Sequence, residues 1–221
     1  MNLLAIETST EACSAAIVLD GDRHQVYELA PRRHAELILS MVDGLLNEAG
    51  ISLQALDGLA FGRGPGAFTG VRIATGVIQG LAYAADLPVV PVSTLAAMAQ
   101  GVADRSGKVA CAIDARIGEV YWGLYVRGEN GIMQPIGQER VCLPDAVDIP
   151  DSGGWYGAGT GWGVYAGRLK DRFGTGLVAM DKDCYPCADA VLTLAQAAFA
   201  RGDTVTAAHA LPVYLRDKVT G

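Results

Sequence analysis

The order of strand-like and helix-like segments is the strongest constraint that this sequence places on its fold. Three strand-like segments open the chain, at residues 3–7, 12–20 and 22–29, and Asp20-Gly21 between the last two is a typical hairpin turn. Helices and apolar strands then alternate, with helices over 33–49, 69–86 and 94–105 and strands over 56–61 and 87–92. A meander followed by alternating strands and helices predicts an α/β lobe with a mixed sheet.

A second, weaker series of the same kind begins near residue 107. It has strands over 108–114, 118–127, 132–141, 154–159 and 176–180, and helices over 162–173 and 188–201. The repeated order predicts two α/β lobes without a clear sequence repeat. We divide the chain into an N-terminal lobe of residues 1–103 and a C-terminal lobe of residues 104–221, whose last helix can pack back on the N-terminal lobe.

Composition and charge narrow the class of protein further. The chain is 51% hydrophobic and 19% charged, with a mean hydropathy of +0.26, which predicts a large buried core rather than disorder. A formal charge of −7 opposes binding to nucleic acid or to an anionic membrane by this chain alone. Gln79 and Asp86 interrupt the longest apolar stretch, and no signal peptide is recognisable, so we expect a cytoplasmic protein that does not enter a membrane.

Cysteine and histidine spacing predicts neither a disulfide framework nor a metal site. The five cysteines are widely spaced, and the C-x-x-C of Cys184 and Cys187 lacks a second ligand pair, so its role stays open. The histidines at 24, 34 and 209 are too far apart for a helical metal motif, and His34, at a helix start, is expected to be exposed.

Several turns carry residues that could face a nucleotide between the two lobes. They are Glu7, Thr8 and Ser9 after the first strand, Gly64 and Gly66 before the second helix, Asp114 in the second lobe, and Gly159 before a later helix. Backbone amides and hydroxyl groups at such turns can hold a phosphate, and a carboxylate can hold its metal ion. The same residues are also ordinary in tight turns, and neither glycine run matches a dinucleotide or P-loop fingerprint.

The first two predicted helices have apolar side chains around a wider arc than packing on one sheet requires. In both 33–49 and 69–86 the apolar side chains cover about 200°, whereas a helix lying on one sheet needs a stripe only a little over ~100° wide. Gly76 and Gly80 lie four residues apart and permit close approach of another helix. The two helices can cover part of each other, and the excess predicts a helix-mediated protein interface.

Six segments together resemble the TsaB (YeaZ) family of bacterial proteins. In chain order they are LLAIETSTEACSAAIVLDG, RRHAELILSMVDGLL, GRGPGAFTGVRIATGVIQGLA, IDARIGEVYW, GTGWGVY and PVYLRDKV. The resemblance runs nearly end to end, with Glu7 where the family more usually has Asp. It implies an actin/hexokinase/Hsp70-like ATPase fold of two lobes, each a mixed sheet with helices.

The resemblance also implies a function. Members of this family lack transferase activity but pair with the transferase TsaD and recruit the ATPase TsaE. The assembly transfers a threonylcarbamoyl group to the adenosine beside the anticodon of tRNA. For this chain it implies a homodimer when alone, tRNA contact only through the complex, no cofactor of its own, and an adenine nucleotide only at the assembled complex.

The family pairs through its first two helices, which assigns interface residues here. They are Ile38, Met41, Val42 and Leu45 on the first helix, and Val71, Ile73, Ala74 and Val77 on the second. The two histidines that hold a metal in the catalytic relative correspond to Thr94 and Met98, which cannot bind a divalent ion as a pair. The resemblance therefore implies neither catalytic nor metal-binding residues.

Two alternatives remain beside this interpretation. The chain could be a stand-alone ATP-dependent enzyme or a peptidase of the same fold, acting through Glu7, Asp114 and the glycine turns. It could also capture tRNA directly through Arg168, Lys170 and Arg172, although Asp171 dilutes this basic group and the net charge opposes it.

Overall fold

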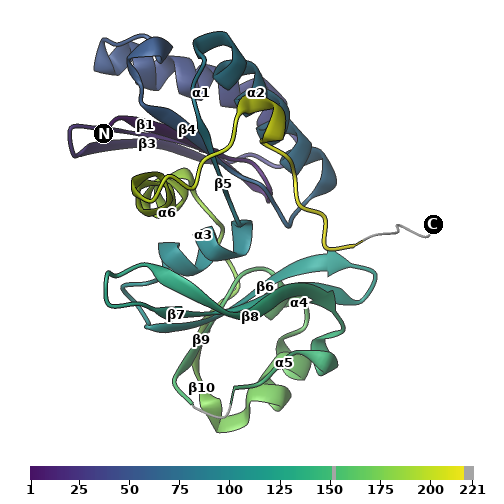
Figure 1. Cartoon of the computed structure of the whole chain (residues 1–221). Coiled ribbons are helices and arrows are strands. Elements are labelled where there is room, and N and C mark those ends of the chain that lie inside the picture. The colour runs from purple at the N-terminus through teal and green to yellow at the C-terminus, as the bar shows by residue number, and fades with distance from the viewer. Residues whose placement is uncertain (151–152, 217–221) are drawn as a thin grey trace.

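The N-terminal half of the chain forms a five-stranded mixed sheet. In a computed structural model, which describes residues 1–150 and 153–216, the strand order is β3-β2-β1-β4-β5 (Figure 1). The strands are β1 (Leu3–Glu7), β2 (Ala12–Leu19), β3 (Asp22–Leu29), β4 (Gly58–Gly62) and β5 (Val89–Val92). The first three form an antiparallel meander, whereas β4 and β5 run parallel to β1.

The C-terminal half repeats this arrangement. Its sheet has the order β8-β7-β6-β9-β10, again an antiparallel meander followed by two parallel strands. The strands are β6 (Lys108–Arg116), β7 (Glu119–Arg127), β8 (Met133–Cys142), β9 (Trp155–Ala158) and β10 (Leu177–Asp181). The same pairing in both halves confirms the predicted duplication and the two-lobed actin/hexokinase/Hsp70-like fold class.

Helices cover both faces of the N-terminal sheet, because its central strands carry apolar side chains on both sides. Successive residues of a strand point to opposite faces, so Leu4 and Ile6 pack under α1 (His34–Ala49) and α2 (Phe68–Ala85). Leu3 and Ala5 pack on the other side against α6 (Ala188–Ala200), the last helix of the chain. Helix α6 therefore lies on the N-terminal sheet although it follows the C-terminal sheet in sequence (Figure 1).

Helix α3 (Thr94–Gly101) lies between the two sheets (Figure 1). It contacts α6 on one side and β6, β7 and β8 on the other, and Leu95 and Met98 are buried against the C-terminal sheet. The opposite face of that sheet packs against an aromatic cluster, in which the rings of Trp122, Trp162 and Phe173 lie 5.5–6.2 Å apart.

The helix predicted over 162–173 is in fact broken in two. Helix α4 (Gly161–Val164) ends at Tyr165, whose φ of −117° and ψ of 29° are not helical, and α5 (Ala166–Phe173) follows. Trp162 Nε1 donates a hydrogen bond to the Ala110 carbonyl, and Tyr165 OH donates one to Asp114 at 3.1 Å. These two anchors on β6 fix α4 in an orientation that α5 does not continue.

After α6 the chain returns across both lobes. Val205 pairs with Val89 of β5, Gln79 donates a hydrogen bond to the Ala210 carbonyl, and Val213 N–H donates one to the Arg63 carbonyl. Figure 1 shows this segment in yellow, running past α2 toward the C-terminal sheet. Within residues 1–150 and 153–216, no helix is long and apolar enough to cross a membrane.

Candidate partner-binding face and inter-lobe cleft

The structure places most of the predicted interface residues in the protein's own core. Ile38, Met41, Val42 and Leu45 of α1 are buried against the N-terminal sheet. Their spacing of three and four residues is that of a helix stripe facing a core, and the sequence could not show which edge of the wide apolar arc faces the sheet. We therefore correct this assignment: these four side chains anchor α1 and are not available to a partner.

On α2, two of the four predicted interface residues are likewise buried and two are partly exposed. Val71 and Ala74 are buried, which removes them from the predicted interface as well. Ile73 and Val77 are partly exposed, although both also pack against the core of the lobe. Of the four residues predicted on α2, only Ile73 and Val77 therefore remain accessible to a partner.

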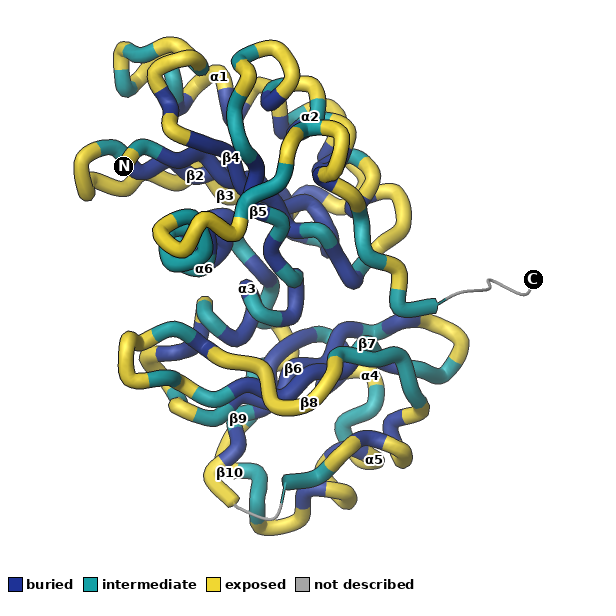
Figure 2. The backbone as a smooth tube through the Cα atoms, viewed as in Figure 1, coloured by how far each residue is buried: buried dark blue, intermediate teal, exposed yellow. Residues whose placement is uncertain are grey.

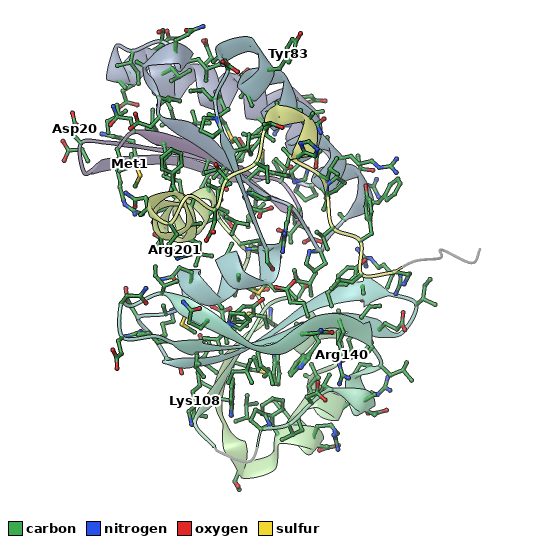
Figure 3. All side chains as sticks on the ribbon, in the orientation of Figure 1. Met1, Asp20, Tyr83, Lys108, Arg140 and Arg201 are labelled. Atoms are coloured by element: carbon green, nitrogen blue, oxygen red, sulfur yellow. The ribbon has the colours of Figure 1, made fainter. Side chains whose placement is uncertain are left out.

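The outward surface of α1 and α2, on which Glu36, Asp43 and Glu48 of α1 are also exposed, includes an apolar part. We call this part the outer helix face; its residues are Leu37, Leu39 and Gly44 on α1, and Ile73, Gly76, Val77, Gly80 and Tyr83 on α2. A Cβ atom placed on any of its three glycines would meet nothing within 4 Å. The exposed and half-buried stretches of both helices lie on the same outer side of the lobe (Figure 2). Tyr83, which is 85% exposed, projects outward from α2 (Figure 3).

Glu7 is sealed inside the N-terminal lobe rather than facing the cleft. Its side chain has no exposed surface, and a Cβ atom on Gly62 would overlap its carboxyl group. Ser9 N–H donates a 2.6 Å hydrogen bond to Glu7 Oε1, while the neighbouring Thr8 hydroxyl donates to the Gly70 carbonyl. Burial raises the pKa of the Glu7 carboxyl above its ordinary value. A carboxyl group enclosed in this way cannot bind a metal ion in the cleft.

A cleft of about 800 Å³ nevertheless opens between the two lobes. Of the predicted cleft residues, Ser9, Gly66 and Asp114 line it, whereas Glu7, Thr8, Gly64 and Gly159 are not among its lining residues. The two excluded glycines serve close packing: a Cβ atom on Gly64 would lie 2.8 Å from the Val213 carbonyl oxygen, and one on Gly159 would lie 2.7 Å from Met98 Sδ.

Asp114 at the cleft is already engaged within its own hairpin. It forms an ion pair with Arg116 at 3.0 Å, accepts a hydrogen bond from the Arg116 backbone N–H, and accepts another from Tyr165 OH. These contacts support the plain interpretation of Asp114 as a turn carboxylate.

Sequence reasoning missed the cationic and aromatic residues of the cleft. The Arg72 guanidinium lies 3.6 Å from the centre of the Phe68 ring, and Arg72 Nε donates a 3.0 Å hydrogen bond to Tyr214 OH. Arg216 donates to the Ala115 carbonyl and forms an ion pair with Glu119. The four-residue spacing of Phe68 and Arg72 was a usable signal, but nothing local links either residue to Tyr214.

The cysteines, the histidines and the residues at the expected metal positions show no sign of a catalytic or metal-binding role in the described chain. Burial raises the pKa of the Cys184 thiol to about 12 and also raises the pKa of the Cys187 thiol, so both are poor nucleophiles at neutral pH. Thr94 and Met98 are buried in α3. His34, expected to be exposed, is 7% exposed at the start of α1. Over the described ranges no three His, Cys, Asp or Glu side chains are grouped so as to hold a metal ion.

Comparison with known proteins identifies the family. The family model described as TsaD, tRNA N6-adenosine threonylcarbamoyltransferase, matches residues 22–158. The tRNA threonylcarbamoyladenosine biosynthesis protein TsaB of Escherichia coli K12 is 47% identical over 99% of this chain and 96% of its own length. The chain belongs to the TsaB family. It is thus a tRNA threonylcarbamoyladenosine biosynthesis protein with a TsaD-related fold.

Other TsaB relatives agree with this placement. The Haemophilus influenzae TsaB protein is 40% identical over 100% of this chain and 95% of its own length. The solved structure of YeaZ from Pseudomonas aeruginosa superposes with a TM-score of 0.90 at 51% identity, covering 97% of this chain and 99% of that one. The two-lobed architecture of the chain is therefore that of a solved TsaB-type protein.

Proposed function

We propose that this chain is a non-catalytic scaffold subunit for threonylcarbamoyl transfer to the adenosine beside the anticodon of tRNA. It pairs with a TsaD-like transferase through the outer helix face, recruits a TsaE-like ATPase, and contacts tRNA only through the assembled complex. The observation that carries the proposal is the outer helix face itself, because a Cβ atom on its glycines would meet nothing within 4 Å in the described chain and its apolar side chains are exposed or only partly buried.

The dimensions of the two helices suit such pairing. At 1.5 Å per residue, the 16 residues of α1 and the 18 of α2 extend about 24 Å and 27 Å. Two helices from each partner packed in this way can supply a standard interface of about 1,600 Å² in total. The N-terminal lobe, residues 1–103, is then the pairing lobe, and in the absence of the transferase the same face serves a homodimer.

The sealed Glu7 supports a role without catalysis. Its carboxyl is enclosed and its pKa is raised by burial, so the β1 turn offers no anionic ligand to a metal–nucleotide complex. In this proposal the chain has no cofactor of its own, and an adenine nucleotide binds only where the assembled complex provides a site.

Size-exclusion chromatography with light scattering tests the pairing, on the purified chain alone and mixed with the purified TsaD-like transferase. Gly80→Leu fills open surface on the outer helix face without touching the core, and Ile73→Asp places a charge on the same face. Each variant should weaken pairing by about 10-fold or more. Val178→Asp, which alters an exposed valine on β10, is the matched control and should pair normally. Normal pairing by both face variants contradicts the proposal.

An activity assay tests the absence of catalysis. The chain alone should transfer no threonylcarbamoyl group, hydrolyse no ATP and cleave no peptide, and transfer should appear when the TsaD-like and TsaE-like proteins are added. Turnover by the pure chain that is lost in Glu7→Gln would instead establish an enzyme with its own active site.

A further inference from the structure

The mouth of the inter-lobe cleft is apolar and exposed. Phe68 of α2, Ile117 of the β6–β7 turn, Val164 of α4 and Tyr214 of the C-terminal segment all line it, and they are between 42% and 70% exposed. These four side chains come from distant parts of the sequence and from both lobes. Large apolar side chains gathered at an opening, rather than scattered singly, are typical of an interaction site.

Ile117 is held at this opening by an unfavourable backbone conformation. Arg116, Ile117 and Gly118 have φ values of +63°, +54° and +79°, and a β-branched residue at positive φ is a strained exception. Contacts on the turn maintain it, since Arg116 pairs with Asp114 and Arg216 donates to the Ala115 carbonyl. A strained turn that presents an isoleucine to solvent points to a role for that side chain in binding.

Arg72 supplies a positioned positive charge without a matching negative one. Arg116 and Arg216 have carboxylate partners, Asp114 and Glu119, but Arg72 has none among residues 1–150 and 153–216. Phe68 and Tyr214 hold its guanidinium in place through the ring contact and the Nε hydrogen bond. In a chain of net charge −7, this is a local site for a carboxylate.

The start of α2 adds to this preference. Its first turn contains no acidic residue, and Ala67 at the N-cap provides no side-chain hydrogen bond, so the partial positive charge of the helix end is uncompensated. The buried Thr10 hydroxyl oxygen, which has no hydrogen-bond partner in the described chain, belongs to a residue of the same cleft. The helix end favours a negatively charged group beside Arg72.

We propose that the cleft mouth is a second docking site for the pairing partner, taking a segment with an acidic side chain next to a bulky apolar one. The carboxylate pairs with Arg72, and the apolar side chain covers Ile117 and Val164. Arg72, Gly76 and Gly80 follow one another at four-residue intervals along α2, so a partner seated on the outer helix face continues directly to the cleft mouth. This inference rests on the proposed pairing with the TsaD-like transferase.

Charge reversal tests the site with the purified chain and the purified TsaD-like transferase. Arg72→Glu should weaken pairing by about 10-fold and reduce its dependence on salt. Arg201→Glu, at the exposed end of α6, is the matched reversal and should leave pairing unchanged. Tyr214→Phe removes the hydrogen bond that positions Arg72 while keeping the ring and the charge, so it should weaken pairing, but less than Arg72→Glu does.

Photo-crosslinking identifies the occupant directly. Ile117→p-benzoylphenylalanine should crosslink to the transferase, and mass spectrometry should place the crosslink within a segment that contains Asp or Glu beside an apolar residue. A crosslink to a segment without an acidic residue overturns the proposal, and so does a crosslink to residues 217–221 of the same chain.

The two proposals fail in different ways. If Gly80→Leu prevents pairing while Arg72→Glu does not, the cleft inference is wrong and the proposed function stands. If Gly80→Leu and Ile73→Asp both pair normally, the proposed function itself is wrong.

Discussion

At the scale of single residues, Glu7 and Gly62 are sterically complementary. The carboxyl group of Glu7 fills the space that the missing side chain of Gly62 leaves, and the Ser9 N–H donates to it. The sequence placed Glu7 correctly at the end of a strand but could not show that the strand beside it carries a glycine at the matching position. The register of β1 against β4 decides that a potential ligand becomes a core group.

Replacing Glu7 by Gln should remove a pH-dependent loss of stability. Because burial raises the pKa of the folded-state carboxyl, the unfolded chain binds fewer protons than the folded one between the ordinary and the raised pKa. The stability contributed by the protonated group is complete below the ordinary pKa and declines as pH rises through this window. Urea unfolding at about pH 5 and about pH 7 should show Glu7→Gln gaining stability relative to the parent as pH rises. Glu129→Gln in an exposed turn is the control, and an equal difference at both pH values would refute the argument.

Gly62→Ala should expose the coupling between the two residues. The added methyl group overlaps the Glu7 carboxyl, and overpacking of this kind costs about 1–3 kcal/mol of unfolding free energy. In the double variant with Glu7→Ala the space is vacated, so the two effects should be strongly non-additive. Denaturant unfolding of both single variants and the double variant measures the coupling, and simple additivity would be inconsistent with direct contact.

At the scale of elements, periodicity predicted which segments are helices but not how α1 and α2 are oriented. An apolar arc of about 200° has two edges, and only tertiary packing decides which of them lies on the sheet. The buried stripe through Ile38 and Leu45 and the outer glycines of α2 are both consistent with the sequence pattern. The break between α4 and α5 was likewise invisible, because its cause is the attachment of Trp162 and Tyr165 to β6.

Gly76→Ala should separate folding from pairing on α2. Gly76 is in the helix interior with open space around it, so alanine should stabilise the monomeric chain, measured at a concentration too low for self-pairing, by about 0.5–1 kcal/mol. The same methyl group holds a partner helix further away, so pairing with the transferase should weaken. Urea unfolding of the chain and a titration with the transferase measure the two effects. A variant that gains stability and pairs as tightly as the parent shows that no helix approaches closely at this position.

At the scale of the whole molecule, the repeated strand order could be predicted because each lobe contains its own meander and its own α/β units. The contacts that join the two lobes could not be predicted from the sequence. Helix α3 between the sheets, α6 on the N-terminal sheet and the returning C-terminal segment all depend on long-range packing, and the last of them contributes Tyr214 and Arg216 to the cleft. The cleft residues that sequence reasoning missed, Arg72, Tyr214 and Arg216, are those that such long-range contacts bring together.

The distribution of charge over the whole chain leads to a prediction about tRNA. In the strongest basic group of the sequence, Arg168 is paired with Asp145 and Arg172 donates to the Val147 carbonyl. The net charge of the chain is −7. Phosphate binding requires positive charge that is free to displace counterions, so about 1 µM of this chain alone should not shift tRNA in a gel at moderate salt. Addition of the transferase should produce binding, and Arg168→Gln with Lys170→Gln in that complex should leave both the affinity and its salt dependence unchanged. A shallower salt dependence in this double variant would mean that the α5 surface contacts tRNA phosphates, and a gel shift by the chain without the transferase would establish direct capture.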